Sequence, residues 1–315
     1  MSKTRSSRPP VLITMGEPSG IGPEVALRAY EALGGVIGER PLKFVGDPAL
    51  FPGVPSDAVI ASRGCSAEAV PGKADPANTP AVVDAIDTAV KYAMSGAAGA
   101  VVTAPIHKAS LLKGGFEFAG HTEYLAQITG ADRAVMMLAG PGLRVVPLTI
   151  HIALSQVPAR ITKTAIVETG EIVLAALRRD FAIADPRLAV AGLNPHAGEE
   201  GELGLEERDT IAPSCEALRG FGHSVLGPLP ADTMFHAESR ARYDAALCMY
   251  HDQALIPLKT LAFWEGVNVT LGLPIVRTSP DHGTALDIAG TGKADARSMI
   301  AAIRMAAEIA DAREH

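Results

Sequence analysis

The segment from residue 250 to residue 295 places single polar side chains between apolar, strand-like runs, a pattern typical of binding and catalytic loops. Ordinary loops use polar residues for solubility, but they rarely set lone histidine, lysine, asparagine and arginine residues beside apolar strand ends. Such side chains can ligate a metal, carry a proton or bind an anion. The alternative is a set of turn and capping residues in a mixed sheet. The polar residues of this segment are His251, Asp252, Gln253, Lys259, Asn268, Arg277, Asp281, His282, Thr284 and Asp287.

Three histidines follow apolar runs that we expect to be β-strands: His151 after VVPLTI, His196 after LAVAGLNP and His251 after AALCMY. Open α/β sheets place their ligand sites at such strand ends. Three imidazoles can hold a divalent metal and leave one position open for water or substrate. Asp232 and Asp252 can serve as further ligands or orient an imidazole. The spacing matches no sequence motif, so separate half-buried histidines bonded to backbone remain the alternative.

The elements that must position these residues alternate between strand and helix patterns, which indicates an α/β fold with substantial parallel character. Thr79 is expected to cap the helix that follows it, and residues 227–235 are expected to form a loop bearing Asp232. The principal strands are expected at 10–15, 42–46, 134–140, 143–154 and 243–253, the last ending near His251, and the principal helices at 79–96, 163–180, 207–222 and 297–312.

The composition narrows the class of protein. The chain has 315 residues, long enough for two domains, with 48% hydrophobic, 20% charged and 4% aromatic residues. A net charge of −7 argues against binding to nucleic acid. Three scattered cysteines, Cys65, Cys215 and Cys248, form no disulfide framework and favour a reducing cytoplasm. No apolar run is long enough for a membrane span, and the first residues do not resemble a signal peptide.

A glycine-rich turn, GEPSGIGPE, follows the first expected strand and leads into a helix. Its spacing is neither the GxGxxG of dinucleotide-binding domains nor a phosphate loop that ends in Gly-Lys-Ser/Thr. The chain therefore has no GxGxxG turn followed by an acidic residue about 20 positions on. A Rossmann domain is therefore not expected, and a nicotinamide cofactor, if one is used, must bind elsewhere.

Taken in order, the motifs of this chain resemble those of the 4-hydroxythreonine-4-phosphate dehydrogenase family, which acts in pyridoxal 5′-phosphate (vitamin B6) biosynthesis. GIGPEV and DHGTALDIAG are also similar to stretches of isopropylmalate dehydrogenases. The resemblance extends from Gly16 to Asp295, nearly the whole chain. The motifs that carry it are GEPSGIGPE, TAPIHK, GHTEYLA, LTIH, NPHAGE, PADT, YHDQ, GVNVTLGLPIVRTSPDHGTALDIAG and GKAD.

This resemblance implies an isopropylmalate dehydrogenase-like fold, with two α/β domains and a cleft between them. We expect a first domain of residues 1–118 plus 290–315, and a second domain of residues 119–289 that carries the metal and substrate residues and the dimer interface. The resemblance further implies a homodimer whose active site is shared across the interface, with metal ligands that come from both subunits.

Carried over motif by motif, the resemblance also implies a role for each candidate residue, with NAD or NADP as cofactor and one divalent metal per subunit (Zn, Mg, Co or Mn). The metal ligands would be His151, His196 and His251. The contacts to a small phosphorylated substrate would be His121, Thr122, Lys259, Asn268 and Arg277. The cofactor contacts would be His282, Gly283, Thr284 and Asp287.

The general base stays open at this point, with Lys259, Asp232 and Asp252 as candidates. Related branches of the family act on erythronate or threonate phosphates, or on aromatic cis-diols, and share much of the same pattern. Two other classes are also compatible with the residues. A three-histidine site can serve a metal-dependent hydrolase, and the same fold can belong to a metabolite-binding protein without turnover.

Overall fold

The computed structural model describes residues 8–62, 68–118 and 120–314, which form two compact units. The first unit spans Met1–Ala134 and Leu273–Glu314, and the second spans Val135–Gly272. Both boundaries differ from the expected ones at 118/119 and 289/290. Residues 120–134 and 273–289 belong to the first unit, because the strand at 277–280 pairs with the strand at 100–103 and the helix at 121–129 packs on the helix at 79–94.

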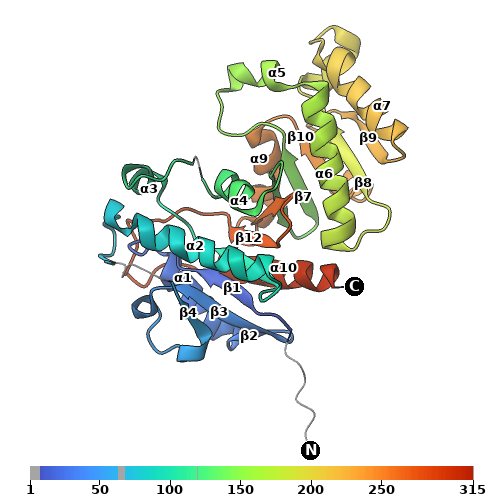
Figure 1. Ribbon diagram of the computed structural model, residues 1–315. Helices are drawn as coiled ribbons and strands as arrows, with labels where there is room; N and C mark the ends of the chain where they lie inside the picture. Colours follow the sequence, from blue (N-terminus) through green and yellow to red (C-terminus); the bar gives the residue numbers. More distant parts are fainter. Residues whose placement is uncertain (1–7, 63–67, 119, 315) are drawn as a thin grey trace, which may run out of the picture. The chain divides into compact units, whose positions relative to one another are not determined.

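The first unit is built on a mainly parallel sheet in the order β2-β3-β1-β5-β12, with β4 also pairing with β3. Helix α2 packs on β1, β3 and β5, and helix α10 packs on β5 and β12 (Figure 1). The strands are β1 Val11–Thr14, β2 Val36–Ile37, β3 Arg40–Gly46, β4 Val59–Ala61, β5 Ala100–Thr103 and β12 Arg277–Pro280; the helices are α1 Gly22–Leu33, α2 Thr79–Met94, α3 Lys108–Lys113, α4 His121–Thr129 and α10 Arg297–Arg313.

The second unit has a mixed sheet in the order β11-β6-β7-β10-β8-β9, parallel from β7 to β9 and antiparallel between β11, β6 and β7. Its strands are β6 Val135–Gly140, β7 Leu143–Pro147, β8 Arg187–Ala191, β9 Ser224–Leu229, β10 Ala245–Cys248 and β11 Val267–Leu271; its helices are α5 Val157–Arg160, α6 Lys163–Phe181, α7 Ala212–Gly220, α8 Ala237–Arg240 and α9 His251–Ala262.

The core of the second unit lies where α9 packs on β6, β7 and β10. Leu138, Val145, Ala246, Ala254 and Leu258 all belong to one buried cluster there. Burying each large aliphatic side chain stabilises the fold by about 1.5–3 kcal/mol. This packing anchors the amino end of α9 next to the carboxyl ends of β7 and β10.

Most expected elements are present, with four differences. Strand β10 ends at Cys248, although a strand was expected over 243–253. His251 instead begins helix α9, which contains Pro257. Strand β9 covers 224–229, including part of the expected loop; its Pro228 is tolerated because β9 is an edge strand. Strand β7 ends at Pro147, before the expected limit of 154. Thr79 is the first residue of α2 and makes no capping bond.

Candidate metal and anion sites

The loops after β7 and β10 lie side by side because these two strands are parallel neighbours, with Cys248 opposite Pro147. Two long-range hydrogen bonds continue the pairing beyond the strands. The backbone N–H of Leu148 donates to the carbonyl of Cys248 (2.7 Å), and the Thr149 hydroxyl donates to the carbonyl of Met249 (2.8 Å). Both strand ends are thus held before the chain reaches His151 and His251.

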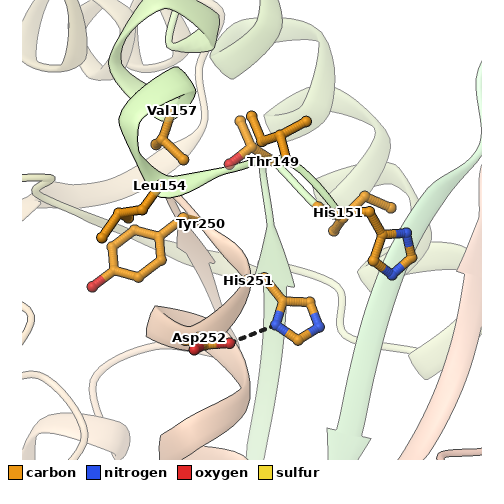
Figure 2. Close-up of a pocket in the computed structure, with 9 residues that line it drawn as sticks. Thr149, His151, Leu154, Val157, Tyr250, His251 and Asp252 are labelled. Atoms are coloured by element: carbon orange, nitrogen blue, oxygen red, sulfur yellow. Dashed lines mark hydrogen bonds and ion pairs between the residues drawn. The ribbon is translucent and has the colours of Figure 1, made fainter.

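His151 and His251 line one pocket of about 290 Å³ in the second unit, shown in Figure 2. Their ring centroids are 6.0 Å apart. The Asp252 carboxylate lies 2.7 Å from Nδ1 of His251, so this carboxylate orients the ring and assigns the proton to Nδ1. The Nε2 lone pair of His251 then remains for an electrophile. The other lining residues are Thr149, Ile150, Ile152, Leu154, Val157 and Tyr250.

Backbone conformation marks both His151 and His196 as unusual positions. Each has a φ of 52°, in the left-handed region that non-glycine residues seldom adopt. His196 begins a run of positive φ values that continues through residue 200. Strained positions of this kind cost on the order of 1–3 kcal/mol each and concentrate at functional sites. The surrounding contacts must therefore hold both histidines in place.

The His196 loop is held by the buried carboxylate of Glu207, which accepts bonds from the backbone N–H groups of Leu193 and Asn194, both at 2.7 Å. Gln253 ties this loop to the histidine pocket. Its side-chain N–H donates to the carbonyl of Gly192 (2.7 Å), and its side-chain oxygen accepts from the N–H of Met249 (2.6 Å). Glu207 was not a predicted site residue, and Gln253 was named only among the polar residues of its segment, without a role. Both are buried polar side chains next to a histidine loop.

Of the three predicted metal histidines, the structure brings two together. His196 is exposed and does not line the pocket of His151 and His251. Across residues 8–62, 68–118 and 120–314, no group of three or more His, Cys, Asp or Glu residues lies close enough to hold a metal. His151 and His251 are neighbours within one chain; the expectation that the full ligand set comes from both subunits stays a prediction.

The three candidate bases lie in different surroundings within the second unit. Asp252 is engaged with His251. Asp232 is exposed on the segment between β9 and α8 and does not line the pocket. Lys259 lies inside α9 and Asn268 in β11, so these two predicted substrate residues are on regular elements and not on the loops we expected. The side-chain oxygen of Asn268 is buried without a partner.

The first unit gathers other predicted substrate residues at the start of α4. His121 and Thr122 begin this helix. Arg277, only 3% exposed on β12, donates to the hydroxyl of Thr103 on the neighbouring β5 from both Nε (3.2 Å) and Nη2 (2.6 Å). Burial lowers the pKa of Arg277 to about 10, so the side chain stays charged at neutral pH. Burial, Arg277 and Lys108 together hold the pKa of His121 well below its usual value, which keeps the imidazole neutral.

The predicted cofactor residues lie on the loop after β12, also in the first unit. The Thr284 carbonyl accepts a bond from the N–H of Ile21 (2.9 Å), and a side chain at Gly20 would collide with that carbonyl. The glycine-rich turn after β1 is therefore packed against this loop. Gly283 and Asp287 are exposed, and Thr284 is buried.

Comparisons with known proteins place this two-unit α/β fold in a defined class. A β-decarboxylating dehydrogenase from Thermococcus kodakarensis shares the fold (TM-score 0.53, 16% identity, 96% of this chain and 82% of that one). The expected isopropylmalate dehydrogenase-like fold is thereby confirmed. The family model "Pyridoxal phosphate biosynthetic protein PdxA" matches residues 51–306, and the chain belongs to that family.

Relatives cover nearly the whole chain. The 4-hydroxythreonine-4-phosphate dehydrogenase of Paracoccus denitrificans is 56% identical over 96% of this chain and 98% of its own. The crystal structure of the Klebsiella pneumoniae enzyme of the same name superposes with a TM-score of 0.85 (36% identity, 96% and 99% coverage). A terephthalate 1,2-cis-dihydrodiol dehydrogenase from Burkholderia xenovorans is more distant, with a TM-score of 0.67 and 30% identity over 94% and 96% of the chains. Among the described helices, none has the length and apolar character to cross a membrane.

Proposed function

We propose that this chain is a 4-hydroxythreonine-4-phosphate dehydrogenase. It would oxidise 4-phosphohydroxy-L-threonine to a β-keto acid that decarboxylates to 3-amino-2-oxopropyl phosphate, in pyridoxal 5′-phosphate biosynthesis. The observation that carries this proposal is identity of 56% over 96% of the chain to a relative of that name. We place the enzyme in the cytoplasm, in keeping with Cys215 and Cys248, which are buried thiols outside any disulfide.

The histidine pair fits a divalent metal. Two imidazoles face one pocket, and a carboxylate orients one of them as in known metal sites. We propose that His151, His196 and His251 hold the ion, with His196 brought in by its loop. When bound, a divalent metal polarises the alcohol oxygen of a substrate and stabilises the charge that develops there. Of the four candidate ions, Zn and Co suit three imidazoles best, whereas Mg and Mn prefer oxygen ligands.

Within this scheme the protein side chains have separate tasks. Asp252 orients His251, which leaves Lys259 and Asp232 as candidates for the general base. His121, Thr122 and Arg277 bind the phosphate from the first unit, and Lys259 and Asn268 contact the substrate from the second. We place NAD or NADP, which accepts the hydride, on the loop that carries His282, Gly283, Thr284 and Asp287.

A single assay tests the proposed function. Absorbance at the reduced-nicotinamide band is followed with NAD or NADP, a divalent metal and each of four substrates: 4-phosphohydroxy-L-threonine, D-erythronate 4-phosphate, D-threonate 4-phosphate and an aromatic cis-diol. We expect the first substrate to give the highest kcat/KM. The cis-diol is included because of the Burkholderia xenovorans relative. A preference for another substrate would move the chain to a related branch, and hydrolysis without nicotinamide would make it a hydrolase.

We further propose that the active site is completed by a second copy of the chain. Exposed apolar side chains on and just after α9, namely Ile256, Leu261, Phe263 and Trp264, offer a surface for such a contact. Isologous contacts of this kind are the most frequent assembly of soluble oligomers. The second copy would bring the phosphate residues of one subunit to the histidine pocket of the other.

Mixing two chains that each lack a different part of the site measures this sharing. A His251→Ala chain combined with an Arg277→Met chain should recover about a quarter of wild-type activity, because half of the dimers are mixed and each has one intact site. The matched control is His151→Ala with His251→Ala. These two residues line one pocket of one chain, so no mixed dimer regains an intact site. The shared site would be contradicted if both mixtures recovered the same activity, or if the mixture of His251→Ala with Arg277→Met recovered none.

A further inference from the structure

We propose that Lys108 is an additional phosphate-binding residue of the first unit, acting on the same anion as His121 and Arg277. This proposal rests on the proposed function, since it names a further contact to the phosphorylated substrate. Lys108 begins helix α3, and α4 is the next helix along the chain (Figure 1). The sequence motifs assign no role to Lys108.

The first observation is the state of His121. Its Nε2 atom is sealed from solvent and has no hydrogen-bond partner, although an imidazole nitrogen in such a place normally has one. Two cations, Arg277 and Lys108, act electrostatically on this ring, and both favour its neutral form. Two cations beside a neutral histidine indicate a binding site for an anion. The anion would accept a hydrogen bond from Nε2–H of His121 and balance the charges of Arg277 and Lys108.

The second observation places the lysine ammonium over Gly120. A β-carbon added to Gly120 would lie 3.2 Å from Cε and 3.4 Å from Nζ of Lys108. Gly120 has an extended φ of 172°, a backbone conformation that any residue can adopt. The glycine is therefore not required by the backbone, and the relevant feature is the volume that its missing side chain leaves empty. The absent side chain leaves room for the lysine to cross the amino end of α4.

The third observation is the end of α4 itself. This nine-residue helix has no side-chain cap, and its N-cap residue Gly120 is the residue that Lys108 lies next to, so the first N–H groups of the helix are near this lysine. Helix amino ends favour phosphate because the N–H groups and the helix dipole both act on the negative charge. Two cations, the sealed Nε2 of a half-buried imidazole and a helix amino end are therefore available to one anion.

Glu123 supplies the competing explanation. Its carboxylate lies 3.7 Å from the same position over Gly120, so Lys108 could serve only to neutralise an acidic side chain in the first turn of α4. Within the described residues, no ion pair closer than 4.0 Å joins Lys108 to Glu123. A double variant separates the two roles.

Calorimetric titration of the metal-free, full-length protein with inorganic phosphate tests the proposal without any turnover. Lys108→Met should weaken phosphate binding about three- to tenfold, a modest loss because the side chain is exposed. Lys108→Arg should bind phosphate within about twofold of wild type, since it keeps the charge. Lys113→Met, at the far end of the same helix, is the matched control and should bind phosphate as wild type does.

The double variant Lys108→Met/Glu123→Gln should bind phosphate as weakly as Lys108→Met does. If it regained wild-type binding, or if Lys108→Met alone bound phosphate normally, Lys108 would have no part in the anion site. In the dehydrogenase assay, Lys108→Met should raise KM for the phosphorylated substrate and leave kcat nearly unchanged. A chain that failed that assay, yet showed the Lys108-dependent phosphate binding, would contradict the proposed function and not the anion site.

Discussion

His251→Ala is expected to lower kcat by about a thousandfold or more, equivalent to roughly 4 kcal/mol of transition-state stabilisation. His251 is the histidine whose ring is both paired with His151 and oriented by Asp252. Its removal leaves His151 alone in the pocket and only two of the three proposed ligands, too few to retain a divalent ion. The variant should stay folded, because the side chain faces a pocket and is not part of the core.

Three measurements check this result: kcat with saturating metal, metal content after dialysis, and the rise in Tm when metal is added. Wild type should gain stability from metal, and His251→Ala should not. His236→Ala is the matched control, since His236 is an exposed histidine of the same unit that bonds only to nearby Glu238 and Ser239. A His251→Ala protein that kept stoichiometric metal and a normal kcat would refute the metal assignment.

Arg277→Met has the second-largest expected effect, a loss of about tenfold to a hundredfold in kcat/KM for the phosphorylated substrate. A charge-assisted hydrogen bond of about 1.5–3 kcal/mol accounts for that range. A guanidinium that is 3% exposed and held by Thr103 is already in place before the anion arrives, so little ordering is needed on binding. A dephosphorylated analogue lacks the group and should be affected far less.

Because Arg277 is buried, the same change can also affect folding, so Tm is measured with the kinetics. Arg277→Lys keeps the charge but not the planar fork and should lie between wild type and Arg277→Met in kcat/KM. Arg304→Met, an exposed arginine on α10 of the same unit, is the matched control and should change neither quantity. Equal fractional losses on the phosphorylated and dephosphorylated substrates would show that Arg277 does not bind the phosphate.

Local patterns in the sequence were sufficient to predict several helices and strands of both units. The apolar periodicity of 79–96 predicted α2, and short apolar runs predicted β1, β3 and β6, because these signals depend only on neighbouring residues. The same patterns marked His151, His196 and His251 as candidates through their position after apolar runs. The motifs then indicated the family, because their residue types and their order along the chain resemble those of its members.

The tertiary structure decided which of these residues meet. Pairing of β7 with β10, together with hydrogen bonds between residues 100 positions apart, brings His151 to His251. The fold of the first unit also places Arg277 of β12 and Lys108 of α3 where both act electrostatically on His121, and we propose an anion site there. The strand expected to reach residue 253 ends at Cys248, and the chain continues from His251 as helix α9, because packing on β6, β7 and β10 stabilises this helix in spite of Pro257. Long-range packing and hydrogen bonding depend on residues far apart in the chain, and local sequence patterns do not encode that pairing.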